Sequence, residues 1–478
     1  MSMSATLFTA LSGLTAASRA AEVASSNVAN ALTEGYARRE LHLTARSVGG
    51  GGQGVTVGGV TRFLDRALLN DRRIAEGGAG DRDLRASFLA QLETTLGTPD
   101  SAGSLGAKVA ALDAALIAAA SRPDAEARLG NVISAAKAIV TQIAATSDQI
   151  QTARATADDR IASDVAVVNA NLALVVELNA AILKQTSAGR DASALLDQRQ
   201  QRVDQIAAII PLREVERGNG QTALYATSGA ALLDGRAYTL GFDPVGVITP
   251  DMTLASGALS GLTVNGKPAG ATGGTLAGHF AVRDDLAPAA QTRLDAVARD
   301  LLGRFNGAGV DTTLAPGAPG LFTDAGGAFI GANETGLSQR LAINAAADPA
   351  KGGALWRLRD GLGATAPGPV GASALLGRMQ AALTEARVPA SGGFTAGARS
   401  HGGLVSDLLS GVASNRLAAE SEASFATSRA ETLKVLELQN GVDTDQEMQH
   451  LLLIEQAYSA NAKVVQTVDS MLQILLEL

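Results

Sequence analysis

Apolar and small residues repeat with alternating spacings of four and three at both ends of this 478-residue chain. This alternation is typical of a coiled-coil seam, because it keeps one stripe of side chains facing a partner helix. The N-terminal seam consists of Leu7, Leu11, Leu14, Ser18, Ala21, Ser25, Val28 and Leu32. Beside it runs a row made almost entirely of alanine and glycine: Ala10, Gly13, Ala17, Ala20, Ala24, Asn27 and Ala31. The small row predicts that another helix approaches closely, and Gly35 predicts the end of this helix.

The C-terminal seam has the same spacing with bulkier side chains: Leu451, Ile454, Tyr458, Asn461, Val465, Val468, Leu472 and Leu475. An adjacent row consists of Leu453, Ala457, Ala460, Val464, Thr467, Met471, Ile474 and Leu478. The sequence from Thr444 to Glu447 predicts a capping box at the start of this helix. Together the two rows make an apolar arc of about 150°, which is wider than one partner helix needs.

Two arrangements account for these rows. Amphipathic helices usually pack the core of a bundle within one chain. Here, the position of both helices at the termini and the breadth of the C-terminal arc favour a pair whose remaining apolar face is covered by neighbouring subunits. We therefore expect residues 1–35 and 443–478 to form one terminal coiled-coil domain, through which copies of the chain polymerise.

Between the termini the pattern is mainly helical. From residue 124 to about 186 it is nearly unbroken, with a third heptad-like register: Ile161, Val165, Val168, Leu172, Val175, Asn179 and Ile182. A shorter helix then ends near Pro211, where a helix cannot easily continue. The Gly-rich stretch that contains Val55, Val57 and Val60 predicts a short strand or hairpin.

The stretch from 211 to 278 differs from its surroundings, because Asn-Gly and Asp-Gly turn signals separate short runs, as in a small β domain. We expect it to be inserted into a long helical rod domain made of residues 36–210 and 279–442, and to lie at the end opposite the termini. The predicted fold class is therefore mainly α with a small β module. Because the module carries neither terminal seam, its removal is expected to spare export and assembly.

The composition excludes several classes of partner. A net charge of −8 argues against nucleic acid and against anionic membrane surfaces, both of which bind clustered Lys and Arg. We expect no stretch of about 18 apolar residues able to span a bilayer. The N-terminal segment lacks a basic region before its apolar positions, so a cleaved signal peptide is not expected. The chain has no cysteine, which leaves the redox compartment open.

No motif predicts an enzyme. His42, His279, His401 and His450 are far apart in sequence and have no metal-ligand spacing, so we expect no metal and no cofactor. The Gly-rich stretch near residue 50 lacks the Gly-Lys-Ser/Thr ending of a phosphate-binding loop, and a flexible turn explains it better. No nucleophile-elbow motif is present, and we assign no catalytic residue.

The segment "ATLFTALSGLTAASRAAEVASSNVANALTEGYARRELHL" resembles the N-terminal signature of the flagellar rod, hook and hook-associated protein group. The matching positions are Ser26, Asn27, Ala29, Asn30, Thr33, Gly35, Tyr36 and Arg38. "EQAYSANAKVVQTVDSMLQILLEL" is similar to the C-terminal helix of that group, at Gln456, Ala457, Tyr458, Ala460, Ala462, Lys463, Val464, Met471 and Leu472. Glu34 departs from the pattern, because these proteins commonly carry proline there.

In the interior, the long helical region and the segments "SALLDQRQQRVDQIAAI" and "GGTLAGHFAVRDDLAPAAQTRLDAVARDLLGRFN" resemble the hook-associated protein 1 branch of this group, whereas hook and rod subunits are chiefly β between their termini. The resemblance implies an extracellular structural subunit at the junction of hook and filament, assembled as a ring and exported through the flagellar channel. The implied partners are copies of itself, hook subunits, a neighbouring junction protein, the filament and an export chaperone. A hook or rod subunit is the nearest alternative, and a secreted adhesin or enzyme is the more distant one.

The expected assembly interface combines the two seams with the signature that follows the first helix. Its residues are Leu7, Leu11, Leu14, Asn27, Val28, Asn30, Leu32, Gly35, Tyr36, Arg38, Leu451, Ile454, Tyr458, Val465, Val468, Leu472 and Leu475. In this interpretation the segment "TEGYARRE" directs the chain out of the helix pair, while Tyr36 and Arg38 make contacts beyond it.

Overall fold

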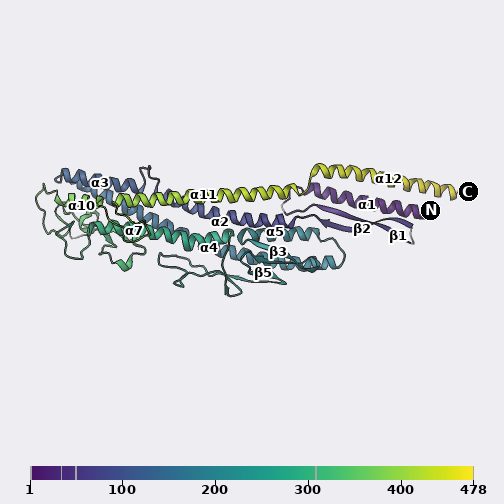
Figure 1. Cartoon of the computed structure of the whole chain (residues 1–478), viewed down its shortest axis with the longest axis horizontal. Helices are drawn as coiled ribbons and strands as arrows, with labels where there is room; N and C mark the ends of the chain where they lie inside the picture. The colour runs from purple at the N-terminus through teal and green to yellow at the C-terminus, as the bar shows by residue number, and fades with distance from the viewer. Residues whose placement is uncertain (1–2, 34, 49–50, 307–308, 477–478) are drawn as a thin grey trace.

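The computed structural model describes residues 3–33, 35–48, 51–306 and 309–476. The molecule is elongated, and both chain ends lie at the same end of it (Figure 1). We call the part that carries the chain ends the terminal unit, and the remainder the body. The predicted fold class is confirmed: long helices dominate, and the sheets are small.

The terminal unit contains two helices and one β-hairpin: α1 (Met3–Ala29), α12 (Thr444–Leu476), β1 (Arg39–Val48) and β2 (Gly51–Arg62). The two helices lie side by side, and the hairpin runs along α1 (Figure 1). The predicted hairpin around Val55 is therefore confirmed. We had placed it in the rod domain, but the Val55 amide donates to Ser12 Oγ at 3.1 Å, which holds the hairpin on α1.

The body is built from helices of very different lengths. They are α2 (Arg66–Leu96), α3 (Leu105–Ser121), α4 (Glu126–Ser187), α5 (Ser193–Ile209), α6 (Gly274–Ala281), α7 (Ala287–Phe305), α8 (Leu337–Arg340), α9 (Arg357–Asp360), α10 (Ala374–Thr384) and α11 (His401–Gln439). A π-helical turn, Val282–Leu286, joins α6 to α7. α11 runs along α2 and leads toward α12 at the boundary with the terminal unit (Figure 1).

The spine of the body is α4, a single helix of 62 residues. All seven positions of its predicted heptad register, from Ile161 to Ile182, are buried. The first half of α4 packs with α3 and α7 in one apolar core, and the second half packs with α5 and the β module in another. One continuous helix is thus shared by both cores.

The expectation that no stretch is apolar enough to span a bilayer was wrong for α4. It contains an 18-residue window with a mean hydropathy of 1.8 and few charges. Its apolar side chains, such as Ile139 and Leu172, are fully buried inside the body. A helix that is packed from several sides needs this composition, so α4 is explained as the central core helix of the molecule.

The β module consists of two antiparallel sheets. The strands are β3 (Leu212–Glu216), β4 (Thr222–Ala226), β5 (Ala231–Asp234), β6 (Arg236–Ala237), β7 (Leu240–Gly241), β8 (Thr263–Val264) and β9 (Lys267–Pro268). The sheet orders are β3-β4-β5-β6 and β7-β8-β9.

The position of the module corrects the prediction that it lies opposite the termini. β3 begins directly after Pro211 and lies against α2, where Glu214 pairs with Arg73. Leu212, Leu224 and Leu233 are buried against α4 and α5, and the module lies beside the middle of the molecule (Figure 1). The far end is formed by α3, α10 and the loops around them.

The Gly- and Pro-rich region after α7 showed little periodicity, yet it completes the first core. It contains only short elements, among them the two-stranded sheet of β10 (Phe322–Asp324) and β11 (Leu341–Ile343). Phe322 lies edge-on to Phe305 of α7, with ring centroids 5.0 Å apart. These loops pack on the core through isolated apolar side chains rather than through a periodic face. Because the buried positions do not recur at a fixed spacing, the sequence shows no pattern there.

Candidate assembly interface

The small-residue row of α1 forms most of its contact with α12. Ala17 and Ala24 are buried against Ile454, with Leu451 beside them. At Gly13 the helices come so close that an added Cβ would lie 2.7 Å from Asn461 Oδ1. The predicted close approach on this face is confirmed, because only small side chains permit this spacing.

The leucine row of α1 does not form the seam with α12, so this part of the prediction was wrong. Leu11 is exposed, Leu32 is 95% exposed, and Leu7, Leu14 and Val28 are only partly buried. Two α-helices approach more closely through Ala and Gly than through Leu, and the small row therefore takes the inner position. The larger side chains remain on the outside of the pair.

The seam of α12 faces α1 as its spacing predicted. Ile454 and Val468 are buried, and Leu451 and Val465 are partly buried. Tyr458 and Leu472 lie at the exposed margin, and the Leu475 side chain lies outside the described residues.

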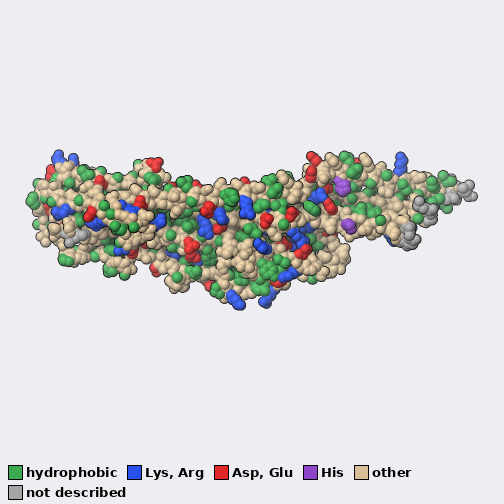
Figure 2. Space-filling view, viewed as in Figure 1, with side chains coloured by type: hydrophobic (Ala, Val, Ile, Leu, Met, Phe, Trp, Pro, Cys, Tyr) green, Lys and Arg blue, Asp and Glu red, His purple; other side chains and the backbone are tan. Residues whose placement is uncertain are grey.

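The neighbouring apolar row of α12 is not covered by the chain itself. Leu453 is 63% exposed and Ile474 is 59% exposed, and Val464 and Met471 are also exposed. Figure 2 shows hydrophobic side chains spread over α12, with few charges among them. The arc is therefore wider than the contact with α1, as its sequence indicated.

Asn27, near the end of α1, joins three segments through hydrogen bonds. Its side-chain amide donates to the Arg39 carbonyl at 2.9 Å and to Glu447 Oε1 at 3.0 Å. Its Oδ1 accepts from the Arg39 amide at 3.0 Å and from the Tyr36 hydroxyl at 2.8 Å. The residue is only 1% exposed. All the hydrogen-bonding capacity of a buried side chain is thus used to join α1, α12 and the start of β1.

Glu447 takes this position because another residue caps α12. Asp443 Oδ1 accepts from the amides of Asp445 and Gln446 at 3.0 and 3.1 Å, so the N-cap lies one residue before the predicted Thr444. Glu447, predicted to belong to a capping box, is released for the contact with Asn27. The motif was read correctly as a helix start, but its acidic residue has a different partner.

The rest of the signature forms a compact turn after α1. The helix ends at Ala29, earlier than predicted, and Gly35 adopts a positive φ of 77° where the Tyr36 amide bonds the Thr33 carbonyl. The Asn30 side chain donates back to the Ser26 carbonyl at 2.9 Å. Glu34, the position that departs from the family pattern, lies outside the described residues.

Tyr36 and Arg38 contact different parts of the terminal unit. Burial raises the pKa of the Tyr36 hydroxyl, and its ring lies 4.8 Å from the Arg39 guanidinium. Arg38 donates to Gln446 of α12 at 3.1 Å, and its guanidinium lies 5.7 Å from the centre of the Phe63 ring. The segment after α1 therefore fastens the two terminal helices and the hairpin together.

A small cluster of residues joins the terminal unit to the body. Arg39 and Arg62, which are cross-strand partners at the base of the hairpin, both contact Asp197 of α5, at 2.6 and 2.8 Å. An added Cβ at Gly35 would lie 2.7 Å from Gln201 Cγ, so the turn also presses closely against α5. Sequence reasoning missed Arg39, Arg62 and Asp197, because nothing in the pattern links residues more than 100 positions apart.

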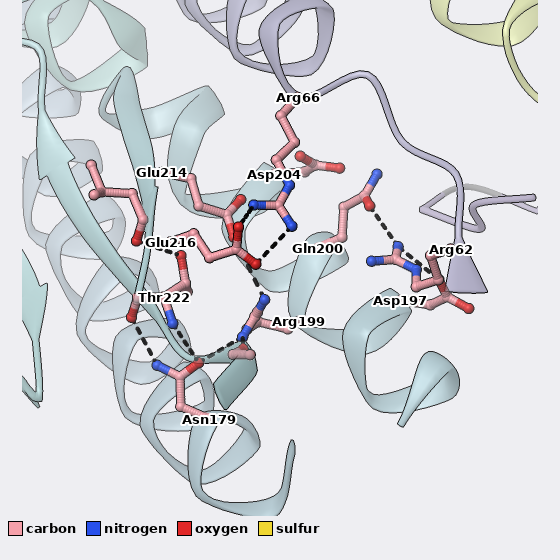
Figure 3. Close-up of polar contacts among 12 residues, drawn as sticks. Arg62, Arg66, Asn179, Asp197, Arg199, Gln200, Asp204, Glu214, Glu216 and Thr222 are labelled. Atoms are coloured by element: carbon pink, nitrogen blue, oxygen red, sulfur yellow. Dashed lines mark hydrogen bonds and ion pairs between the residues drawn. The ribbon is translucent and has the colours of Figure 1, made fainter. Parts of the chain in front are cut away.

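A cleft of 980 Å³ lies beside this joint. Its walls come from α1, the hairpin, the start of α2, the loop between α4 and α5, α5 and the first two strands of the β module. Figure 3 shows polar pairs along the body side, where Arg66 contacts Glu216 and Arg199 donates to Asn179 Oδ1 at 2.9 Å.

Glu214 is the most buried acid on this wall. Burial works to raise its pKa, but the charge of Arg73 and its hydrogen bond at 2.8 Å outweigh that effect, so the pKa lies below its usual value. The carboxylate therefore stays ionised at neutral pH as part of a structural network.

Nothing in the described part of the chain is arranged as a metal centre. No group of three or more His, Asp or Glu side chains is suitably placed there. His401 is buried, and its Nδ1 lies 2.8 Å from Asp300.

Three family models match this chain. The one described as "Flagellar hook-associated protein FlgK helical domain" matches residues 89–321. "Flagella basal body rod protein" matches residues 7–36, and "Flagellar basal body rod FlgEFG protein C-terminal" matches residues 439–478. The last two matches fall on α1 with the turn that follows it, and on α12.

Relatives named flagellar hook-associated protein 1 also match. The protein of Salmonella typhimurium is 28% identical over 240 residues, which cover 49% of this chain and 43% of that protein. The protein of Bacillus subtilis is 25% identical over 250 residues, which cover 49% of each chain. The matched part thus spans less than half the length of these relatives.

A solved structure of the flagellar hook junction protein FlgK from Burkholderia pseudomallei is also similar, with a TM-score of 0.44 and 20% identity. The match covers 53% of this chain and 46% of that one. The family assignment rests on the sequence matches, which cover both terminal helices and the helical interior.

Proposed function

We propose that this chain, which belongs to the flagellar hook-associated protein 1 family, is a structural subunit that joins the hook of the bacterial flagellum to its filament. It polymerises through α1 and α12. One observation carries this proposal: α12 buries one apolar row on α1 and leaves the adjacent row, from Leu453 to Ile474, exposed. A contiguous exposed apolar row on a terminal helix is a surface for another subunit.

The alternatives have less support. A hook or rod subunit would be expected to have a chiefly β interior. The interior of this chain is instead built around the helices α4 and α11, which argues against that alternative. An adhesin or enzyme required a concave site with converging polar groups between residues 211 and 403. The hollow found there measures 250 Å³, and its Arg359 and Asp360 are paired with each other. We propose a structural role rather than a catalytic one.

The partners and the location follow from the same proposal. The neighbours of each subunit are copies of itself, hook subunits, an adjoining junction protein and the filament, outside the cell. The chain reaches this position through the flagellar channel, without a cleaved signal peptide and with the help of an export chaperone. Few aromatic residues and no cysteine suit passage as an unfolded chain.

Electron microscopy of cells that lack the protein tests the proposal. We expect hooks without filaments, and restoration of filaments when the full-length chain is supplied. Normal filaments in the deletion strain would refute the junction role. Loss of the hooks as well would point to the hook or rod alternative.

A further inference from the structure

The cleft between the terminal unit and the body has an excess of positive charge. Six arginines and four acidic residues line it, although the whole chain has a net charge of −8. Most of the acids are already engaged with arginines of the same wall: Glu22 with Arg19, Glu216 with Arg66, and Glu214 with Arg199. The unbalanced cations lie at the joint and on its rim.

At the joint, Arg39 and Arg62 share the single carboxylate of Asp197. Like charges on cross-strand partners repel each other, and one carboxylate neutralises only one of the two. The Nε atoms of both arginines are shielded from solvent and have no hydrogen-bond partner among the described residues. Burial lowers the pKa of Arg62 even though the negative charge of Asp197 acts to raise it. The positive charge of Arg62 is therefore not fully balanced by this carboxylate.

On the rim, Arg190 follows the end of α4 and lines the same cleft. Its side chain is exposed, and within the described ranges it makes no hydrogen bond or ion pair. The exposed guanidinium group of Arg190 on the rim and the mostly buried ones of Arg39 and Arg62 at the joint therefore line the same space. Guanidinium groups bind carboxylates strongly, through short charge-assisted hydrogen bonds.

We propose that this cleft is the docking site for a carboxylate-bearing segment of a second copy of the chain. A second copy is the occupant because α1, one of the two helices through which the proposed polymer forms, supplies one wall of the cleft with Arg19, Val23 and Ser26. The net charge of −8 gives each copy a surplus of carboxylates to offer. The inference rests on the proposed function and adds a second, polar contact to the apolar contact of α12.

Site-specific crosslinking tests the inference, because a chain without cysteine accepts single reporters. Full-length Arg190→Cys, Leu453→Cys and Arg213→Cys variants are labelled with a benzophenone maleimide and assembled onto flagella. Arg190 reports on the cleft, Leu453 on the exposed row of α12, and Arg213, exposed on β3, is the control outside both. After irradiation, dimers are separated and the crosslinked peptides are sequenced.

We expect dimers from positions 190 and 453, and the crosslink from 190 is expected next to an Asp or Glu of the second copy. If position 453 gives dimers and position 190 does not, the cleft is not a docking site, but the proposed function is still supported. Dimers from neither position would contradict both. A crosslink from 190 to a different protein would also overturn the inference.

Charge reversal gives a second readout that does not need the reporter. Arg190→Glu should lower the amount of assembled protein at least about tenfold, because it places like charges opposite each other in the interface. Arg213→Glu, the matched reversal outside the cleft, should assemble normally. Equal behaviour of the two variants would contradict the docking site even if both are exported at normal levels.

Discussion

Asn27 of α1 donates a hydrogen bond of 3.0 Å to Glu447 of α12, a residue 420 positions later in the chain. Both groups are almost fully buried. The contact lies where the two terminal helices, the signature turn and the first strand meet, and it therefore fixes the register of α1 against α12. A polar pair is suited to this task, because apolar contacts between alanines would tolerate a shift along the helix axis.

This arrangement predicts that Asn27→Ala impairs assembly. The substitution leaves the Arg39 amide and carbonyl, the Tyr36 hydroxyl and Glu447 without their partner, at a cost of about 2 to 4 kcal/mol. We expect a marked loss of filaments at matched secreted levels of protein. Asn30→Ala is the control, because the Asn30 side chain bonds only groups of its own helix end and turn. Similar defects in both variants would contradict the special role of Asn27.

The buried row of α12 predicts a contrast between two carboxylates placed on one helix. Val468 is 5% exposed, and Val468→Asp would bury an unpaired charge at a cost of about 3 kcal/mol or more. Gln473 is exposed, and Gln473→Asp should change stability by no more than about 0.5 kcal/mol. Motility and filament number at equal secreted levels give the readout. If the variants behave alike, the assignment of this row is wrong.

The small size of the contact between the terminal helices predicts that they are unstable in the isolated subunit. Their apolar cluster consists of a few alanines with Leu451 and Ile454, whereas α4 has buried residues at regular intervals from Leu129 to Ile182. In the purified monomer, backbone amides of α1 and α12 should exchange with solvent roughly a hundredfold faster than those of α4. Hydrogen exchange measured by mass spectrometry tests this expectation, and equal protection of all three helices would contradict it.

Arg283 predicts how firmly the β module is held. This fully buried residue pairs with the fully buried Asp158 of α4 at 2.6 Å, and its guanidinium lies 5.3 and 4.9 Å from the ring centroids of Phe242 and Phe280. Arg283→Ala leaves the buried carboxylate without its cationic partner, with only the hydrogen bond from the Val245 amide, and should lower the free energy of unfolding by about 3 to 5 kcal/mol. Urea denaturation measures the change. Arg217→Ala, which removes an exposed pair with Asp234, should have little effect.

The same contacts bear on the prediction that removal of the β module spares export and assembly. Arg154 of α4 donates to the Thr249 carbonyl at 3.0 Å, inside the module, and the apolar side of the sheet covers the second half of α4. Deletion of residues 211–278 would expose that half and remove the Thr249 and Met252 carbonyls to which Arg154 donates, together with the Ser260 carbonyl to which Arg283 donates. The sequence showed that the module interrupts helical regions, but it did not show which helices the module covers.

Periodicity predicted the long-range order of this fold wherever one helix face is buried along its length. It identified α4, its register and the inner row of α12, because each buried position recurs at a fixed spacing. It assigned the contact of α1 with α12 to the leucine row, whereas the alanine row makes that contact. The two rows have the same spacing, so periodicity alone does not show which of them faces α12. It could not find the pairing of Arg39 and Arg62 with Asp197, because single charged residues carry no period.

The continuity of α4 has a mechanical consequence. A helix of 62 residues is about 93 Å long, and rotating one core of the body against the other would require breaking its backbone hydrogen bonds. The body therefore behaves as a stiff lever under torsion. Two short chain segments, the arginine–aspartate cluster and the contacts of Gly35 and Arg62 with α5 connect this lever to the terminal unit, so elastic compliance is concentrated at this joint. In an assembly of such subunits, torque would pass through the bodies, and bending would be absorbed where each body meets its terminal unit.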